Sequence, residues 1–293
     1  MGEELQKKIN FDYAQIGGVR LHYATAGNGD RLVLLLHGFP EFWYSWRHQL
    51  IDLSDQYMVV APDMRGYNLS DKPKNISDYE IENLVDDVTG LIRHFGREQA
   101  AVVGHDWGAT VAWKIAEKHP EHLWKLACLQ VPPAAVWKKN QTFRQLLKSW
   151  YMFFFQIPRL PEFLLSLNDY KALENGLKGS TAEGGVFTDQ DIFEYKKAWS
   201  EPGALRSGLN YYRANILRRI FGKQPQTEKI KVPTLFIYGE KDTAVLPETV
   251  KGVGEMIEAE YEEIHIPEAA HWVQQEARET VTQVLRDFLA GEK

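Results

Sequence analysis

Residues 100–109, with the sequence AAVVGHDWGA, constrain the fold and chemistry of this chain more than any other segment. The short apolar run at its start is typical of a buried β-strand, and the residues after it have the pattern of a helix. Gly104 and Gly108 stand two positions either side of Asp106, so the segment predicts a very sharp turn between strand and helix. Such a turn would present the Asp106 carboxylate to an open site. Taken alone, Asp106 could instead face solvent and cap the helix.

A carboxylate at this turn determines the class of reaction that we expect. A carboxylate oxygen attacks an sp³ carbon and forms an ester, whereas a serine hydroxyl at the same place supports acyl transfer. The G-x-D-x-G pattern around Asp106 resembles the G-x-S-x-G nucleophile elbow of the α/β-hydrolases, with aspartate in place of serine. We therefore expect displacement chemistry with Asp106 as the nucleophile.

Apolar strand patterns alternate with helical patterns over most of the chain. We expect strands at residues 19–24, 32–36, 57–61, 100–103, 126–129, 234–238 and 262–266, and helices at residues 43–53, 78–95, 108–118, 247–256 and 276–289. This alternation predicts an α/β fold with a mostly parallel central sheet and helices on both faces. The resemblance of the Asp106 turn to the nucleophile elbow implies that this is the α/β-hydrolase fold. Residues 13–24, interrupted by Gly17 and Gly18, predict an antiparallel hairpin at the sheet edge.

A long helical insertion interrupts the alternation. No buried β-run occurs between Val131 and the polar segment 223–231, but amphipathic helical patterns do, at residues 142–155 and 189–199. The expected parts are residues 1–131 as the first part of the hydrolase core, 132–224 as a helical cap or lid, and 225–293 as the second part of the core. Open α/β sheets bind ligands at the carboxyl ends of their strands, so we expect the lid to enclose the substrate there.

An acid and a histidine follow two of the later strands. Asp242 comes directly after an expected strand, and His271 follows the next one, so the chain order is nucleophile, acid, histidine. We expect Asp242 to hold His271 in one tautomer and His271 to act as general base on a water molecule. Glu240 is the competing candidate for the acid.

The segment HGFPE at residues 37–41 follows the expected strand 32–36. In α/β-hydrolases the loop after this strand supplies one N–H of the oxyanion hole, and the residue after the nucleophile supplies the other. The backbone N–H groups of Phe39 and Trp107 are therefore the expected oxyanion donors.

Over nearly its whole length the chain resembles an epoxide hydrolase of the α/β-hydrolase superfamily, in the branch with an aspartate nucleophile. The motifs that carry the resemblance are HGFPE at 37–41, RGYNLS at 65–70, GHDWG at 104–108 and GEKD at 239–242. The same branch contains haloalkane and haloacetate dehalogenases, so these motifs leave the reaction open.

Two tyrosines of the lid favour epoxide hydrolysis. An epoxide oxygen leaves as an alkoxide, which is far more basic than a phenolate of pKa about 10 and needs a proton donor, whereas a halide needs none. The segments around Tyr151 and Tyr212 resemble the two segments that carry the donor tyrosines of epoxide hydrolases. Packing within the lid is the alternative role for both, and Tyr211 is the alternative to Tyr212. The expected substrate-binding residues are Phe39, Trp107, Phe155 and Trp272.

The dehalogenase alternatives depend on Trp107 and Phe39. Haloacetate dehalogenases carry an arginine at the position of Trp107, which argues against that activity. Trp107 fits a halide donor of haloalkane dehalogenases, but the Phe39 side chain has no N–H to serve as the second donor; another of the nine tryptophans could. A ligand-binding protein without activity is a further alternative. The combination of Asp106, Asp242 and His271 counts against it, because a receptor needs no ester hydrolysis.

Composition limits the partners and cofactors. The net charge of −6 argues against nucleic acid or an anionic membrane as the main partner. Cys128 is the only cysteine, so no intrachain disulfide forms, and no metal-ligand spacing occurs; we expect neither a metal nor an organic cofactor. The apolar run 32–36 is too short to span a membrane, and the acidic N-terminus does not resemble a signal peptide, so we expect a soluble cytoplasmic protein. Its expected partner is a small apolar epoxide, and a homodimer remains open.

Overall fold

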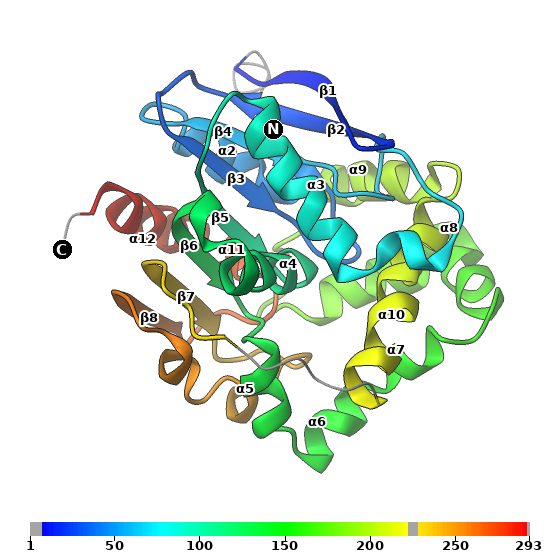
Figure 1. Cartoon of the computed structure of the whole chain (residues 1–293). Helices are drawn as coiled ribbons and strands as arrows, with labels where there is room; N and C mark the ends of the chain where they lie inside the picture. The colour runs from blue at the N-terminus through cyan, green and yellow to red at the C-terminus, as the bar shows by residue number, and fades with distance from the viewer. Residues whose placement is uncertain (1–7, 222–227, 292–293) are drawn as a thin grey trace.

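The computed structural model describes residues 8–221 and 228–291, which form one eight-stranded sheet with helices on both faces (Figure 1). The strands lie in the order β1-β2-β4-β3-β5-β6-β7-β8. Strands β3 to β8 run parallel, and β2 lies antiparallel to both of its neighbours. The α/β-hydrolase fold expected from the sequence is confirmed.

The strands are β1 (Asn10–Ile16), β2 (Val19–Ala26), β3 (Leu32–Leu36), β4 (Met58–Pro62), β5 (Ala100–His105), β6 (Leu123–Leu129), β7 (Thr234–Gly239) and β8 (Tyr261–Ile266). Each expected strand is present. The expected hairpin is formed by β1 and β2 at the sheet edge, where Ile16 pairs with Val19 across the turn. Strand β5 runs further than expected, to His105, so the nucleophile turn follows the strand without a linker.

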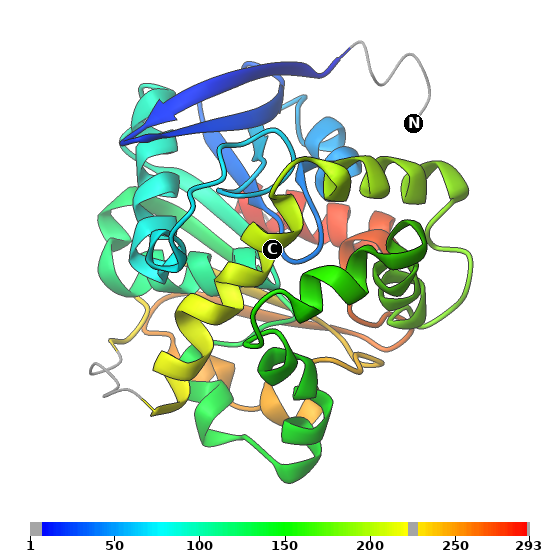
Figure 2. The same cartoon turned by 90° about the vertical axis from the view of Figure 1, so that its right-hand side faces the viewer.

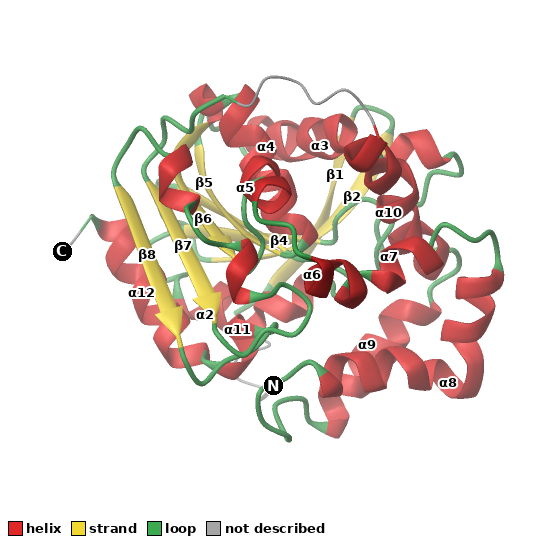
Figure 3. Cartoon of the chain, turned by 90° about the horizontal axis from the view of Figure 1, so that it is seen from below, coloured by secondary structure: helices red, strands yellow, loops and turns green. Residues whose placement is uncertain are grey.

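The helices of the core are α2 (Arg47–Asp52), α3 (Ile81–His94), α4 (Trp107–Lys118), α11 (Val273–Glu276) and α12 (Arg278–Ala290), with 3-10 turns η1 (Trp43–Trp46), η2 (Ile76–Tyr79) and η3 (Pro120–His122). They cover both faces of the sheet (Figure 3). Side chains alternate along β3: Leu34 packs in a core with α3 and α4, and Leu35 packs in a second core with α2 and α12. Both faces of β3 are therefore buried, which explains its uniformly apolar sequence.

Two expected helices are wrong in detail. Residues 247–256 form two 3-10 turns, η4 (Pro247–Thr249) and η5 (Val253–Met256), because Gly252 between them has a φ of 81°, outside the helical region. Residues 142–155 form two short helices rather than one, and the break falls at the buried Ser149.

The described chain between β6 and β7 is helical. Its helices are α5 (Ala134–Lys139), α6 (Phe143–Lys148), α7 (Trp150–Phe154), α8 (Leu160–Gly179), α9 (Asp189–Ser200) and α10 (Ala204–Phe221). These helices gather on one side of the molecule, the side that faces the viewer in Figure 2. Helix α8 is interrupted near its middle, where Asn168, Asp169 and Tyr170 have left-handed backbone values. The division into a core and a lid stays a prediction, and its boundary at residues 224/225 lies outside the described residues.

The parallel strands bring the candidate site together at one edge of the sheet. His37, Asp106 and Gln130 directly follow β3, β5 and β6, and Asp242 and His271 lie in the loops after β7 and β8. Because the carboxyl ends of parallel strands meet at one edge, residues far apart in the sequence become neighbours there. Helices α7 and α10 close over this edge, since they contribute to the same cavity as the nucleophile turn.

Candidate active site

Asp106 occupies the strained turn that the sequence predicts. It lies between β5 and α4 with a φ of 51° and a ψ of −114°. A side chain at Gly108 would place its Cβ 2.2 Å from the carbonyl oxygen of Leu36, so only glycine allows the helix to begin this close to β3. The Asp106 side chain makes no capping hydrogen bond to α4 and is half-buried, so the helix-capping alternative is not what the structure shows.

The Asp106 carboxylate is held by a backbone N–H from the neighbouring loop. Phe39 donates its N–H to Oδ1 of Asp106 at 2.8 Å. This contact depends on Gly38, where an added Cβ would lie 2.4 Å from Oδ1. Trp107 is the first residue of α4, so its N–H has no acceptor within the helix. Of the two expected oxyanion donors, Phe39 therefore contacts the Asp106 carboxylate directly, and Trp107 directly follows Asp106 in the chain.

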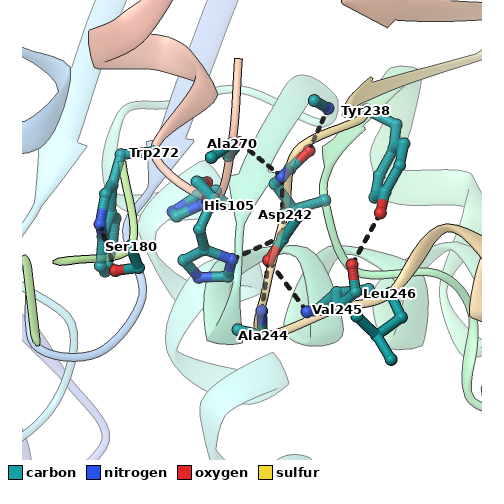
Figure 4. A network of polar contacts seen from close by, with 12 residues as sticks. His105, Ser180, Tyr238, Asp242, Ala244, Val245, Leu246, Ala270 and Trp272 are labelled. Carbon is teal, nitrogen blue, oxygen red and sulfur yellow. Dashed lines mark hydrogen bonds and ion pairs between the residues drawn. The ribbon is translucent and has the colours of Figure 1, made fainter. Parts of the chain in front are cut away.

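Asp242 and His271 form the expected acid–histidine pair. Nδ1 of His271 donates to Oδ2 of Asp242 at 2.8 Å, and both side chains are almost fully buried. Oδ1 of Asp242 accepts the N–H groups of Ala244 and Val245 at 2.7 and 2.9 Å (Figure 4). These bonds fix the carboxylate, so His271 keeps Nε2 as its free ring nitrogen. Glu240, the competing acid, is instead half-exposed on the surface.

The charges around His271 favour its protonated form. Burial alone lowers the pKa of the imidazole, but the ion pair and hydrogen bond with Asp242, together with the negative charges of Asp106 and Glu41, outweigh burial and raise the pKa to about 9. The resting site therefore holds His271 as a cation at neutral pH. Loss of the negative charge of Asp106 would lower this pKa, although Asp242 and Glu41 would still raise it.

Sequence reasoning missed Gln130, which supports the acid. Its side-chain N–H donates to Oδ2 of Asp242 at 2.7 Å and to the carbonyl oxygen of Ala270 at 2.8 Å, and its oxygen accepts the N–H of Gly239 at 2.6 Å. Gln130 has a left-handed φ of 68° directly after β6. The only sequence signal for a role of Gln130 was its place as a polar residue between an apolar strand and Val131.

Sequence reasoning also missed a second buried acid–histidine pair behind the first. His105 binds Oε2 of Glu41 through Nδ1 at 2.9 Å and the backbone carbonyl of His271 through Nε2 at 2.8 Å. Burial raises the pKa of Glu41, but His105 and His37 beside it lower it by more, so Glu41 is ionised. Both residues belong to motifs that the sequence analysis recognised, HGFPE and GHDWG. Their contacts with each other and with the loop of His271 become visible only in the folded structure.

The two expected tyrosines lie together at the cavity that contains the nucleophile. Tyr151 and Tyr212 line the same cavity as Asp106 and His271, with ring centroids 6.0 Å apart. Burial and the negative charge of Asp106 raise the pKa of both hydroxyls well above the ordinary value, so both remain protonated and can donate hydrogen bonds. Tyr211 instead donates to the carbonyl oxygen of Arg65 at 2.8 Å and is not a lining residue.

The cavity is small and mostly apolar. Its volume is about 130 Å³. Apolar lining comes from Trp107, Val131, Trp137, Leu146, Met152, Phe153, Ile216 and Val245. Phe39 and Phe155 are not lining residues; their rings pack against Tyr212, with centroids 5.5 and 5.0 Å away. Trp272 is not a lining residue either; its ring packs against that of His271, with centroids 4.7 Å apart, and its indole N–H donates to Ser180 (Figure 4). The structure therefore brings Trp107 to the cavity, but not the other three expected substrate-binding side chains.

Within residues 8–221 and 228–291, no group of three or more His, Cys, Asp or Glu side chains is arranged to hold a metal ion. In the same part of the chain, no helix is long and apolar enough to cross a membrane. Cys128 is buried in β6, and burial raises the pKa of its thiol well above the ordinary value.

Comparison with known proteins shows the family to which the chain is related. Residues 31–277 match the family model described as the alpha/beta hydrolase fold. The AB hydrolase superfamily protein YfhM of Bacillus subtilis is 40% identical over 288 residues, which cover 97% of this chain and 99% of that protein. Epoxide hydrolase 1 of Caenorhabditis elegans is 40% identical over 287 residues, which cover 94% of this chain and 69% of that protein.

The chain belongs to the epoxide hydrolase family of the α/β-hydrolase fold. A crystal structure of an epoxide hydrolase from Bacillus megaterium in complex with an inhibitor superimposes with a TM-score of 0.85 at 31% identity, over 95% of this chain and all of that one. The family resemblance drawn from the four motifs is thereby confirmed. For this epoxide hydrolase family member, the roles of individual site residues follow from the geometry and are argued below.

Proposed function

We propose that this protein hydrolyses an apolar epoxide to a vicinal diol through a covalent ester on Asp106. The observation that carries the proposal is that Asp106, His271, Tyr151 and Tyr212 all line one small apolar cavity. A nucleophile, a base and two proton donors are the groups that two-step epoxide hydrolysis requires. No cofactor takes part in this scheme.

In the first step, a carboxylate oxygen of Asp106 attacks one ring carbon. Oδ1 is held by the N–H of Phe39, and no hydrogen bond from another described residue reaches Oδ2, so Oδ2 is the free oxygen. The C–O bond of the ring breaks as the ester forms, and its electron pair stays on the departing oxygen. Tyr151 and Tyr212 donate hydrogen bonds to this oxygen, and one of them gives it a proton.

In the second step, water attacks the ester carbonyl. Neutral His271 takes a proton from the water, and the N–H groups of Phe39 and Trp107 stabilise the tetrahedral oxyanion. The intermediate then releases the diol oxygen that came from Asp106 and leaves the water oxygen in the carboxylate. The second proton of the water goes to the released oxygen.

The protons balance because the charge of Asp106 controls His271. Ester formation removes that negative charge, which is one of the causes that raise the pKa of His271. The imidazolium then gives up the proton that replaces the one lost by the tyrosine. His271 regains a proton from water in the second step, and the resting state returns.

A haloalkane dehalogenase remains the alternative on this site, because Trp107 lines the cavity. One observation favours the epoxide. Two neutral tyrosines line the cavity as possible proton donors, and a departing halide has no use for a proton donor.

Isotope labelling tests the covalent step. A single turnover of styrene oxide by excess enzyme in ¹⁸O-water should give an unlabelled diol and place ¹⁸O in the peptide that contains Asp106. Direct attack by water would instead label the diol at the first turnover and leave Asp106 unlabelled. Parallel assays with styrene oxide, short chloroalkanes and fluoroacetate test the reaction class, and a preference for a haloalkane would contradict the proposal. Absence of turnover with every substrate would favour a binding protein.

A further inference from the structure

An outward-facing set of apolar side chains follows α6 and α7 to the start of α8. Phe143, Leu147, Trp150, Phe153, Ile157 and Leu160 recur every three or four residues and are 39 to 75% exposed. These six residues are called the lid apolar surface below. Phe143 and Trp150 alone leave roughly 200–350 Å² of aromatic surface in solvent, which approaches the largest apolar patch of a typical monomer. The helices that carry them lie along the lower and right-hand margin of Figure 1.

Buried polar side chains fix these helices with their apolar residues outward. Gln145 is fully buried, donates to the carbonyl oxygen of Ala244 at 2.7 Å and accepts the N–H of Leu246 at 2.9 Å. It also donates to the hydroxyl of the buried Ser149 at 3.0 Å. An ordinary surface helix buries its apolar face and exposes its polar one. Here the arrangement is reversed, and α6 cannot turn its apolar side inward without breaking these bonds.

The stretch of chain that carries most of the lid apolar surface is basic, although the whole protein is acidic. Residues 122–161 contain no Asp or Glu, although the chain has a net charge of −6. Lys138, Arg144, Lys148 and Arg159 are exposed, and none forms an ion pair within residues 8–221 or 228–291. The net charge of the whole chain argues against an anionic membrane, but the local charge of this segment is positive.

The lid apolar surface is continuous with the wall of the active-site cavity. Phe153 belongs to both, because it is 39% exposed and also lines the cavity beside Asp106 and His271. Leu146 and Lys138, from the same stretch of the lid, are lining residues too. The exposed apolar side chains therefore border the cavity that holds the nucleophile.

We propose that the lid apolar surface docks this protein onto an anionic lipid bilayer, with the cavity facing the lipid. The apolar side chains enter the boundary of the acyl chains, Trp150 lies at the level of the headgroups, and Arg144 and Lys148 bind lipid phosphates. An apolar epoxide dissolved in the bilayer then reaches the cavity directly. This last step rests on the proposed function, whereas the docking does not.

A second copy of the chain is the other occupant to consider. In a two-fold interface the same patch meets itself, so Arg144 and Lys148 would approach their own counterparts. Residues 122–161 contain no carboxylate to pair with them, and Glu162 and Glu255, which adjoin this stretch, already form ion pairs with Arg213 and Lys139. Like charges across an interface are repelled. An anionic bilayer supplies the opposite charge, which is why we commit to lipid.

Trp150 offers a direct probe of docking. It is 63% exposed, whereas the other tryptophans of the chain are buried or half-buried. We expect phosphatidylcholine–phosphatidylglycerol vesicles with brominated acyl chains to quench part of the tryptophan fluorescence, and Trp150→Phe to remove that quenching. Pure phosphatidylcholine vesicles should quench far less at low ionic strength, because they lack the anionic charge.

Charge and apolar contributions are separated by two pairs of variants. In vesicle flotation, Arg144→Glu/Lys148→Glu should weaken binding about thirty-fold or more. Lys74→Glu/Arg93→Glu changes the net charge equally at exposed positions outside the patch and should bind nearly as wild type.

The apolar pair uses two exposed phenylalanines. Phe143→Ser should weaken vesicle binding about tenfold or more, because the variant lacks an exposed phenylalanine that the bilayer would bury. Phe193→Ser removes a comparably exposed side chain, 61% against 75%, on α9 and should have little effect.

Binding that needs anionic lipid and is lost in the two patch variants supports the proposal. Absence of vesicle binding by the wild type at low ionic strength would overturn it. The proposal would also be overturned if sedimentation velocity showed that the wild type is a dimer and that Phe143→Ser is a monomer. Vesicle binding is measured without substrate, so an inactive enzyme that still binds vesicles would refute the proposed function alone, and an active enzyme that ignores vesicles would refute the docking alone.

Discussion

The backbone N–H of Phe39 donates a 2.8 Å hydrogen bond to Oδ1 of Asp106. In the proposed mechanism this donor acts twice. It first orients the carboxylate for attack, and after the ester forms it lies beside the carbonyl oxygen that becomes the oxyanion. Because the donor belongs to the backbone, its position depends on the path of the chain at Gly38 rather than on a side chain.

Gly38→Ala tests this dependence. The three atoms nearest to the added Cβ would all belong to the Asp106 side chain, at 2.4 to 2.7 Å, so the carboxylate must move. We expect kcat/KM on an epoxide to fall about 10²-fold or more, as for other small displacements of a reacting group. Gly18→Ala is the matched control, because a Cβ there meets no atom within 4 Å. Wild-type kinetics in Gly38→Ala, with thermal unfolding to confirm the fold, would show that the Phe39 contact does not matter.

His271→Gln should separate the two half-reactions. Attack by Asp106 needs no imidazole, but ester hydrolysis does, so the ester should accumulate. Intact-mass measurement after mixing with styrene oxide should show one substrate added per chain, and steady turnover should fall by about 10²–10⁴-fold. His265→Gln is the control, since His265 is a surface residue that contacts Glu263 and Glu240. Substrate binding without any adduct would count against His271 as the base.

The local parts of the site could be predicted from the sequence. Gly104 and Gly108 specify the turn at Asp106 within a few residues, and the central parallel strands were found because a strand buried on both faces is a continuous apolar run. Asp242 was found because it comes shortly after such a run, β7, and His271 because it lies in the loop after the next strand, β8. Each of these features depends on neighbouring residues in the sequence, so hydrophobic periodicity and turn residues are enough to predict it.

The supporting contacts could not be predicted, because they join distant segments. Gln130 reaches Asp242 across 112 positions, and Glu41 reaches His105 across 64. The expected helix at 142–155 breaks at Ser149, whose hydroxyl accepts a hydrogen bond from Gln145, and Gln145 in turn binds the distant loop at residues 244–246; no local sequence pattern indicates these contacts. The side chains that line the substrate cavity could not be predicted reliably. An aromatic residue such as Phe155 can pack against a tyrosine of the cavity wall just as well as against a ligand.

The pKa of His271 should depend on the charge of Asp106. In the resting enzyme that pKa is raised to about 9, and Asp106 is one of the charges that raise it. Asp106→Asn removes the charge with little change in shape, so the pKa of His271 should fall below about 9. A titration of the imidazole resonances by NMR, with His271→Gln for assignment, measures this shift. An unchanged pKa would show that Asp242 and Glu41 alone control the imidazole.

The same coupling sets the pH dependence of turnover. Hydrolysis of the ester needs neutral His271, so its rate should rise with pH and level off above the pKa of the alkylated enzyme. The ester carries no charge on Asp106, so this kinetic pKa should lie below the value of about 9 of the free enzyme. Single-turnover decay of the ester across a pH series measures it. A rate that rises only above pH 9 would argue that Asp106 has no influence on His271.

Removing the tyrosine hydroxyls should distinguish an epoxide hydrolase from a dehalogenase within one protein. Tyr151→Phe and Tyr212→Phe each remove one donor and almost no volume, so packing should change little. General-acid catalysis contributes roughly 10²–10⁴-fold, and each single variant should lose less than this because the other hydroxyl remains. The double variant should lose the whole contribution in the alkylation step measured by stopped flow, since the alkoxide would then depart unprotonated. Hydrolysis of a preformed ester should change much less, because that step uses His271 and the backbone donors.

Tyr211→Phe is the matched control for this series. It removes a buried hydroxyl that donates to the carbonyl oxygen of Arg65 outside the cavity, so it should lower stability without slowing alkylation. A halide needs no proton, so hydrolysis of a haloalkane, if any is measurable, should be insensitive to the loss of either hydroxyl. Wild-type alkylation of an epoxide by the double variant Tyr151→Phe/Tyr212→Phe would therefore move the proposed function to dehalogenation, because it would leave the two buried donors opposite Asp106 without a role in the chemistry.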